Sequence, residues 1–164
     1  MNCASKEDEM YSPVSYKLEI PTLFANKLIA PIIPVDNPLT KEGVALGKKL
    51  FFDKILSGND AQSCASCHQP QNSFSDNQQF SLGIDKKLGT RNAMPLFNLA
   101  WNYDEKFFWD GNTFSLEHQV FVPVSDPKEM KSSWTTVEQK LQNHLEYPDL
   151  FEAAFGTKNI DSTM

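Results

Sequence analysis

The chain has 164 residues, of which 40% are hydrophobic and 22% are charged. This length suits one domain with one core, and no apolar run approaches the roughly 18 residues that a membrane-spanning helix needs. The 21 acidic residues exceed the 15 basic ones, and the formal charge of -6 argues against nucleic acid as a partner. A basic protein partner is compatible with this charge.

Prolines divide the first 38 residues too closely for a long helix; they are Pro13, Pro21, Pro31, Pro34 and Pro38. We therefore expect a polar, proline-rich, extended arm over residues 1–38, laid on a domain over residues 39–164. Cys3 opens a short acidic stretch of this arm, as the lipidated cysteine of a mature bacterial lipoprotein does. A lipid tether at Cys3 and an ordinary polar tail both fit this pattern.

The first two helices of the domain are indicated by cap residues and by apolar spacing. Thr40 is a candidate N-cap for a helix over about 41–53, in which apolar side chains recur at helical intervals. Ser115 is a candidate N-cap for a second helix, which Pro123 is expected to end. Between them, residues 69–95 are polar and show neither helical nor strand periodicity, so we expect a long functional loop there.

Two more helices are expected near the C-terminus. One is expected to begin at Thr135 or Thr136, with Val137, Leu141 and Leu145 on one face. The other follows Pro148 and is expected to end at Gly156. The predicted fold is therefore all-α with long loops.

Residues 64–68 form a C-x-x-C-H motif made by Cys64, Cys67 and His68. In covalent haem c, two such thiols add to the haem vinyl groups, and the adjacent histidine ligates the iron. This interpretation needs no further residue from the sequence, and one covalent haem c per chain is our prediction.

Three other interpretations of the motif are weaker. A zinc site needs two further ligands, and the remaining histidines, His118 and His144, lie 26 residues apart. A redox dithiol expects a βαβ pattern around the motif, which is absent here. Three cysteines in the chain do not make a disulfide framework.

The second axial position of the iron decides between electron transfer and reaction with peroxide. No histidine lies between His68 and His118, so no imidazole from the loop after the motif can fill that position. Met94 and Met130 are the methionines within reach, although methionines more often fill a core. A peroxidase and a mono-haem electron carrier without catalysis both remain open on this ground.

From about Leu46 onward, the chain resembles the N-terminal, peroxidatic domain of the bacterial di-haem cytochrome c peroxidases, a family that includes the MauG-type enzymes. The resemblance rests on four segments in order: LGKKLFFDKILSGNDAQSCASCHQPQNSFSD, GTRNAMPLFNLAWN, FFWDGNTFSLEHQVFVPVSDPKEM and YPDLFEAAFG. It implies a cytochrome c-like haem domain of a cytochrome c peroxidase. Such an enzyme reduces hydrogen peroxide to water with electrons from a small donor protein, a cytochrome c or a cupredoxin.

By motif position, the resemblance assigns roles to residues around the haem. His68 would be the proximal iron ligand, and Cys64 and Cys67 would be the thioether anchors. Asn92, in the RNA motif, would be a ligand of a calcium ion between the two haem domains. Trp109, in the FWDG motif, would lie on the electron path between the haems.

Two further residues are implied to line the distal pocket beside the open iron site. Gln119 would orient peroxide, and Glu129 would be the acid/base group that moves a proton during cleavage of the O–O bond. Glu117 is a competing carboxylate, although it does not occupy the motif position and fits a first-turn helix acid. Without the resemblance, Trp109 would be read as a core aromatic and the distal residues as surface groups.

The chain departs from the family pattern in two respects. Ile84 stands where some members carry a loop histidine that blocks the iron, so we expect an iron that is not bis-histidine ligated and needs no reductive activation. No second C-x-x-C-H motif occurs before Met164. We therefore expect the electron-storing haem domain to be missing here, the calcium site to be incomplete and turnover by this chain alone to be poor.

The cofactor also sets expectations for location and partners. Haem c is attached outside the bacterial cytoplasm, so we expect a periplasmic or membrane-anchored protein. The family resemblance implies a homodimer for the intact enzyme. The substrate remains open between peroxide and, as in the MauG branch, a protein residue oxidised at long range.

Overall fold

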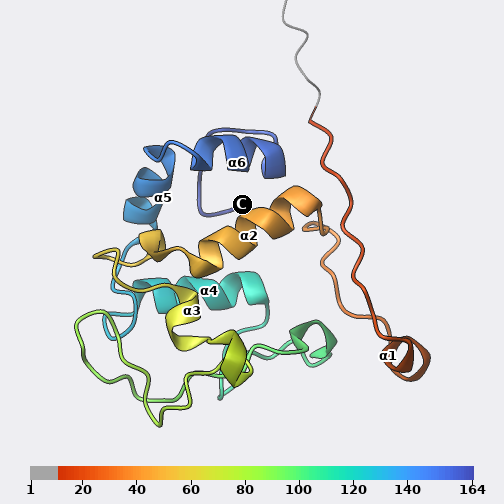
Figure 1. Ribbon diagram of the computed structural model, residues 1–164, viewed down its shortest axis with the longest axis horizontal. Coiled ribbons are helices and arrows are strands. Elements are labelled where there is room, and N and C mark those ends of the chain that lie inside the picture. The colour runs from red at the N-terminus through yellow and green to blue at the C-terminus, as the bar shows by residue number, and fades with distance from the viewer. Residues whose placement is uncertain (1–10) are drawn as a thin grey trace, which may run out of the picture.

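The computed structural model describes residues 11–164 (Figure 1), and residues 1–10, with Cys3, lie outside the described residues. The lipid tether at Cys3 therefore stays a prediction. Over residues 11–164 the regular structure is helical, with only isolated β-bridges, which confirms the all-α prediction. None of the helices in this range has the length and apolarity that crossing a bilayer requires.

The α-helices of residues 11–164 are α1 (Thr22–Lys27), α2 (Lys41–Phe52), α3 (Cys64–Cys67), α4 (Leu116–Ser125), α5 (Trp134–Gln142) and α6 (Tyr147–Phe155). Short 3-10 helices lie at η1 (Lys54–Leu56), η2 (Pro70–Asn72) and η3 (Leu99–Trp101). Helix α2 packs against α6 and α3, and α5 packs against α6 and α4. Most of the core lies between these helices; its buried apolar residues are Leu46, Leu56, Val124, Met130, Val137, Leu141, Tyr147, Phe151, Ala154 and Ile160.

The two N-caps predicted from the sequence are confirmed, but the end predicted for α4 is wrong. Thr40 Oγ1 accepts a hydrogen bond from Gly43 N at 3.0 Å, and Ser115 Oγ accepts one from His118 N at 3.1 Å. Helix α4 does not end at Pro123 but continues to Ser125. Burial of the Val124 side chain, which has 0% exposure, holds this last turn in place.

The predicted start of α5 is also wrong, whereas the end of α6 is confirmed. Helix α5 begins at Trp134, because Ser133 is the N-cap and its Oγ accepts a hydrogen bond from Thr136 N at 3.2 Å. The helix ends at Gln142, so Leu145 does not share its apolar face and is 95% exposed. Gly156 is the C-cap of α6, as expected.

Over residues 11–38 the N-terminal arm is extended, and the short helix α1 is the only helix in that range. Figure 1 shows it running along one side of the helical domain, turning at α1 and returning to α2. The segment before α1 and the segment that returns to α2 are joined by two hydrogen bonds: Tyr16 N donates to Leu39 O at 2.9 Å, and Lys41 N donates to Val14 O at 2.7 Å. Near the turn, Ile32 N donates to Ala100 O at 2.8 Å, which ties the arm to η3.

The long loop predicted over residues 69–95 is confirmed. In this part of the chain the regular structure consists of η2 and of isolated bridges that join Gln69 to Ser75 and Leu82 to Leu88. The first bridge closes a turn directly after the C-x-x-C-H motif. The second closes a turn around Ile84, which brings this turn against the segment that follows α4.

Candidate haem site

The C-x-x-C-H motif forms the single turn of helix α3. Cys64 and Cys67 lie three residues apart in this turn, so both side chains lie on the same face, and neither is in a disulfide. Ser63 and Ser66 cap the turn reciprocally, with Ser63 N donating to Ser66 Oγ at 3.0 Å. His68 follows as the C-cap, and its amide donates to Cys64 O at 2.9 Å.

The His68 ring is oriented by two backbone carbonyl oxygens. Its Nδ1 lies 3.0 Å from Phe74 O and 3.0 Å from Met94 O. Because carbonyl oxygens only accept hydrogen bonds, we assign the ring proton to Nδ1. The lone pair is then on Nε2, which is the tautomer that ligates a metal through Nε2, with the opposite nitrogen fixed by the protein.

Both thiols of the motif are held in the protonated form. Burial raises the pKa of Cys64, and the neighbouring Cys67 adds to the rise. Burial also raises the pKa of Cys67; a hydrogen bond from Gln62 Nε2, at 3.1 Å from Sγ, opposes this rise, and the charges of Asp76 and Glu129 add to it. A reactive dithiol needs a thiolate with a lowered pKa, so redox-dithiol chemistry does not suit this pair.

A zinc site also lacks ligands in the described part of the chain. Over residues 11–164, no three His, Cys, Asp or Glu side chains gather closely enough to hold a metal ion. His118 is engaged with Ser115, at 3.1 Å between Nδ1 and Oγ, and His144 packs edge-on against Tyr147 at 5.0 Å between ring centroids.

A pocket lies beside the second cysteine of the motif. It is lined by residues of the motif and of the following loop: Ala61, Gln62, Ser66, Cys67, Gln69, Asp76, Gln78, Leu82, Gly83 and Ile84. Gln62 joins its two sides, because Nε2 donates to Leu82 O at 3.0 Å as well as to Cys67 Sγ. Ile84, at the position of the loop histidine in some family members, is therefore close to the motif.

Both candidate methionines have other contacts in the structure. Met130 is 5% exposed and packs in the core with Leu46 and Val124. Met94 contributes its carbonyl to His68 Nδ1, so its backbone lies at the end of the imidazole ring that points away from a metal on Nε2. Met130 is thus a core residue, and the backbone of Met94 lies beside Nδ1 of His68.

Glu129 lies near the motif in a setting that favours its protonated form. Partial burial of its carboxyl group, reinforced by the charge of Asp126, raises the pKa of Glu129 although the residue keeps an exposed surface. Its charge in turn acts on the Cys67 thiol. The backbone of Glu129 is tied to the loop after the motif, because Ile84 N donates to Glu129 O at 3.0 Å.

The other two candidates on this side of the chain lie in α4. Gln119 is half-buried, and its backbone N–H donates to Ser115 O at 3.1 Å. Among residues 11–164, no hydrogen bond joins its side chain to Glu129. Burial tends to raise the pKa of Glu117, but hydrogen bonds from its own amide and from Asn37 outweigh this effect, and the pKa lies below its usual value.

The RNA and FWDG motifs are brought together on the surface. Trp109 is 56% exposed, and its Nε1 donates to Asn92 O at 3.3 Å. Beside this contact, Arg91 and Asp110 form an ion pair at 2.8 Å. The side chain of Asn92 is exposed, and among residues 11–164 no group of three His, Cys, Asp or Glu side chains that could hold a metal ion lies around it. Asn92 as a calcium ligand stays a prediction.

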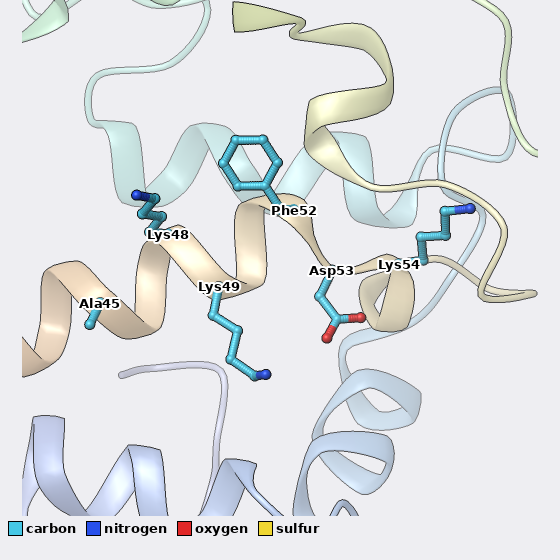
Figure 2. A pocket seen from close by; sticks show the side chains of 6 residues that line it. All are labelled: Ala45, Lys48, Lys49, Phe52, Asp53 and Lys54. Atoms are coloured by element: carbon cyan, nitrogen blue, oxygen red, sulfur yellow. The ribbon is translucent and has the colours of Figure 1, made fainter.

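A second hollow lies along α2 and η1, lined by Ala45, Lys48, Lys49, Phe52, Asp53 and Lys54 (Figure 2). Figure 2 shows Lys48 and Phe52 on one side of α2 and Lys49 and Asp53 on the other, so these side chains do not converge on one point. Lys49 is also engaged, at 2.8 Å from Glu146 Oε2. This hollow shares no residue with the motif and is not the candidate site.

Sequence reasoning missed the residues that orient the site. Phe74 and Met94 act through backbone carbonyl oxygens, so their side-chain types carry no signal. Gln62 precedes the motif by two residues and looks like any polar loop residue. A signal existed only for Arg91 and Asp110, because these opposite charges directly flank the motif residues Asn92 and Trp109.

A helical domain in which an early helix, α2, packs on the last helix, α6, beside a C-x-x-C-H turn has a cytochrome c-like fold. The sequence pattern of the family described as "Di-haem cytochrome c peroxidase" matches residues 41–164. The chain belongs to this family, and the peroxidatic resemblance is confirmed at that level.

Curated relatives carry the names of both branches of the family. The chain is 42% identical over 125 residues to the methylamine utilization protein MauG of Methylorubrum extorquens, a match covering 76% of this chain and 35% of that protein. It is 38% identical over 118 residues to the cytochrome c551 peroxidase of Pseudomonas aeruginosa, covering 72% of this chain and 34% of that protein. The chain therefore spans about a third of the length of these relatives.

Among solved structures, the chain is similar to a MauG-like protein associated with microbial copper homeostasis. The TM-score is 0.75 with 31% sequence identity, and the match covers 87% of this chain and 41% of that one. The family implies haem c as the cofactor, and it confirms the peroxidase class at the family level.

Proposed function

We propose that this chain is the peroxidatic haem c domain of a cytochrome c peroxidase, in which hydrogen peroxide is reduced to water with electrons from a small donor protein. Cys64 and Cys67 would hold one haem through thioether bonds, and His68 would ligate its iron through Nε2. The arrangement fits that group, because both thiols are free on one face and the His68 proton is fixed on Nδ1. When bound, the haem supplies the iron centre at which peroxide is reduced.

The observation that carries this proposal is the location of the two methionines. An electron carrier needs a strong second axial ligand, whereas a peroxidase needs that position open or weakly held. Met130 packs in the core, and the Met94 backbone lies behind the His68 ring. This placement favours the enzyme over the mono-haem carrier.

Glu129 would hold and move the proton that peroxide cleavage requires. A carboxylate oxygen of Glu129 would accept the proton from the peroxide oxygen that lies nearer the haem. Glu129 would then return this proton to the other peroxide oxygen, which leaves when the O–O bond breaks. A raised pKa suits this exchange near neutral pH, and the lowered pKa of Glu117 makes that residue the poorer proton carrier. Gln119 would orient peroxide without adding charge.

The test compares Glu129→Gln with Glu117→Gln in the haem-loaded protein. We expect Glu129→Gln to lower the second-order rate of reaction with peroxide by about 10²–10⁴-fold, the usual contribution of a general acid/base, with haem content unchanged. Glu117→Gln is the matched control and should leave the rate within about twofold. Equal rates for Glu129→Gln and the parent protein would remove Glu129 from its role.

Full turnover would need groups beyond residues 1–164. We propose that a second haem stores one electron, that Trp109 lies on the path to it, and that Asn92 contributes one ligand to a calcium ion shared with that region. We propose a cytochrome c or a cupredoxin as the electron donor and a homodimer as the form of the intact enzyme. The proposed location is the periplasm, with a lipid tether if Cys3 is modified.

The ferric spectrum of the haem-loaded protein tests the enzyme against the electron carrier. We expect a high-spin spectrum that shifts on adding cyanide, whereas a bis-imidazole or methionine-ligated low-spin spectrum would favour the carrier.

A further inference from the structure

The segment from Lys128 to Lys131, which carries Glu129, is enclosed between two loops that each approach it with a glycine. Gly83, from the turn around Ile84, lies against the N-terminal end of the segment. Gly58, from the turn before the C-x-x-C-H motif, lies against its C-terminal end. Both approaches are made to backbone atoms, which cannot move aside as a flexible side chain can.

At Gly83 the approach leaves no room for any side chain. A Cβ at this position would lie 2.0 Å from Lys128 O and 3.1 Å from Glu129 O. The adjacent amide, Ile84 N, donates to Glu129 O at 3.0 Å. The carbonyl of Lys128 would have to move by roughly 1 Å or more to reach ordinary van der Waals distance from such a Cβ.

The contact at Gly58 repeats this arrangement at the other end of the segment. A Cβ there would lie 2.2 Å from Lys131 O and 3.4 Å from Met130 O, and Gly58 N donates to Met130 O at 2.8 Å. Neither glycine has a positive φ. Glycine is therefore needed at these positions because it lacks a Cβ, and not because of its conformational freedom.

We propose that Gly58 and Gly83 are positioning residues for Glu129, because together they fix the backbone on both sides of its carboxyl group beside the haem motif. This inference rests on the proposed function, since that function gives the Glu129 carboxylate its task. It also goes beyond that function, because it assigns the placement of the acid/base group to two loops that contact the backbone of residues 128–131.

The ion pair between Lys131 and Asp85 contributes less to the placement of Glu129 than the two glycine contacts do. Lys131 Nζ lies 2.6 Å from Asp85 Oδ2, and both side chains remain substantially exposed to solvent. Exposed pairs of this kind contribute little, because solvent screens the two charges. The two close backbone approaches and their hydrogen bonds therefore dominate the placement of Glu129, and Asp85→Asn should change it little.

The experiment compares Gly83→Ala and Gly58→Ala with Gly47→Ala in the haem-loaded protein. Gly47 lies in α2 with no atom within 4 Å of an added Cβ, so the same substitution meets open space there. For Gly83→Ala we expect the amide of Ile84 to exchange its hydrogen about tenfold faster. The peroxide rate should fall about tenfold or more, and its pH profile should shift, while haem content is unchanged.

The positioning role is separated from a general loss of stability by a double-mutant cycle. In the Glu129→Gln background, Gly83→Ala should cause no further loss of rate, because the glycine acts through the group already removed. A full further loss in that background, or unchanged exchange at Ile84 in Gly83→Ala, would overturn the inference. If Gly83→Ala does not fold, Gly58→Ala tests the inference in its place. The same measurements are then made at the opposite end of the Lys128–Lys131 segment.

Failure of the proposed function gives a different pattern. If Glu129→Gln leaves the peroxide rate unchanged, the acid/base role is lost. The exchange rate of Ile84 in Gly83→Ala still decides whether the glycine holds the Lys128–Lys131 segment, since that measurement needs no peroxide.

Discussion

At the scale of single residues, a hydrogen bond from a fully buried tyrosine joins α6 to the end of α2. Tyr147 is fully buried, and its hydroxyl donates to Asp53 Oδ2 at 2.7 Å. Burial tends to raise the pKa of Asp53, but the hydrogen bonds from Tyr147 and from Ile55 N outweigh it, and the pKa lies below its usual value. Burial and the Asp53 charge raise the pKa of Tyr147 far above its usual range.

Tyr147→Phe should lower the free energy of unfolding by about 1.5–3 kcal/mol at neutral pH, the typical contribution of a hydrogen bond to a charged group. A carboxyl group whose pKa is lowered by folding stabilises the protein above its unfolded pKa and loses that contribution as the pH falls through the folded pKa. The difference between parent and variant should therefore be full at neutral pH and shrink below about pH 4. Urea unfolding at a series of pH values measures it.

Tyr103→Phe is the matched control for this prediction. Its hydroxyl also makes a hydrogen bond, to Ile29 O at 2.7 Å, but the residue is exposed and its acceptor is neutral. We expect a loss below about 1 kcal/mol that does not depend on pH. A pH-independent loss for Tyr147→Phe would show that the ring packing, and not the bond to the Asp53 carboxylate, is what the substitution disturbs.

The candidate site was predictable from the sequence where side-chain chemistry defines it. Cys64, Cys67 and His68 form a contiguous motif, and their identities alone indicate the cofactor. Their orientation was not predictable, because backbone carbonyl oxygens of Phe74 and Met94 fix the His68 ring. The roles proposed for Gln119, Glu129, Trp109 and Asn92 stay predictions that the variants above test.

At the scale of secondary structure, α2, α4, α5 and α6 were predictable, but several of their ends and the short helix α1 were not. The caps Thr40 and Ser115 stand just before a clear apolar pattern, so local chemistry decides those ends. Pro123 was expected to stop α4, but burial of Val124 extends the helix past it, which is a tertiary effect. In α5, the sequence offers Ser133, Thr135 and Thr136 in one stretch, and packing of Trp134 selects the first as the cap.

The start of α5 gives a direct prediction. Ser133→Ala should lower the free energy of unfolding by about 1 kcal/mol, because it removes the acceptor for the Thr136 amide. Thr135→Ala is the matched control: Thr135 is an exposed residue within the helix, where alanine has the higher helix propensity, so no loss is expected. Thermal unfolding of both variants distinguishes them, and a larger loss at Thr135 would place the helix start where the sequence pattern put it.

At the scale of the whole molecule, the arm and the helical domain differ in how much they bury. The buried apolar core begins at Leu46, and between residues 11 and 38 no residue is fully buried. The arm contacts the domain at several points, which include Ile32 N on Ala100 O, the Tyr11 hydroxyl on Ala154 O and an edge-on contact of Phe24 with Trp101 at 5.7 Å between ring centroids. These contacts order the arm without contributing to the core.

The division into an arm over residues 1–38 and a domain over residues 39–164 therefore predicts that the domain folds alone. A chain reduced to residues 39–164 should unfold in one cooperative transition, with a lower melting temperature than the full chain, because it loses the contacts of the arm but no buried residue of the core. Phe24→Ala in the full chain is the milder comparison, and it should speed amide exchange at Ile32 while leaving the core amides of α2 and α6 protected. A reduced chain that unfolds without cooperativity would make the arm part of the domain, because only loss of core packing removes a single transition.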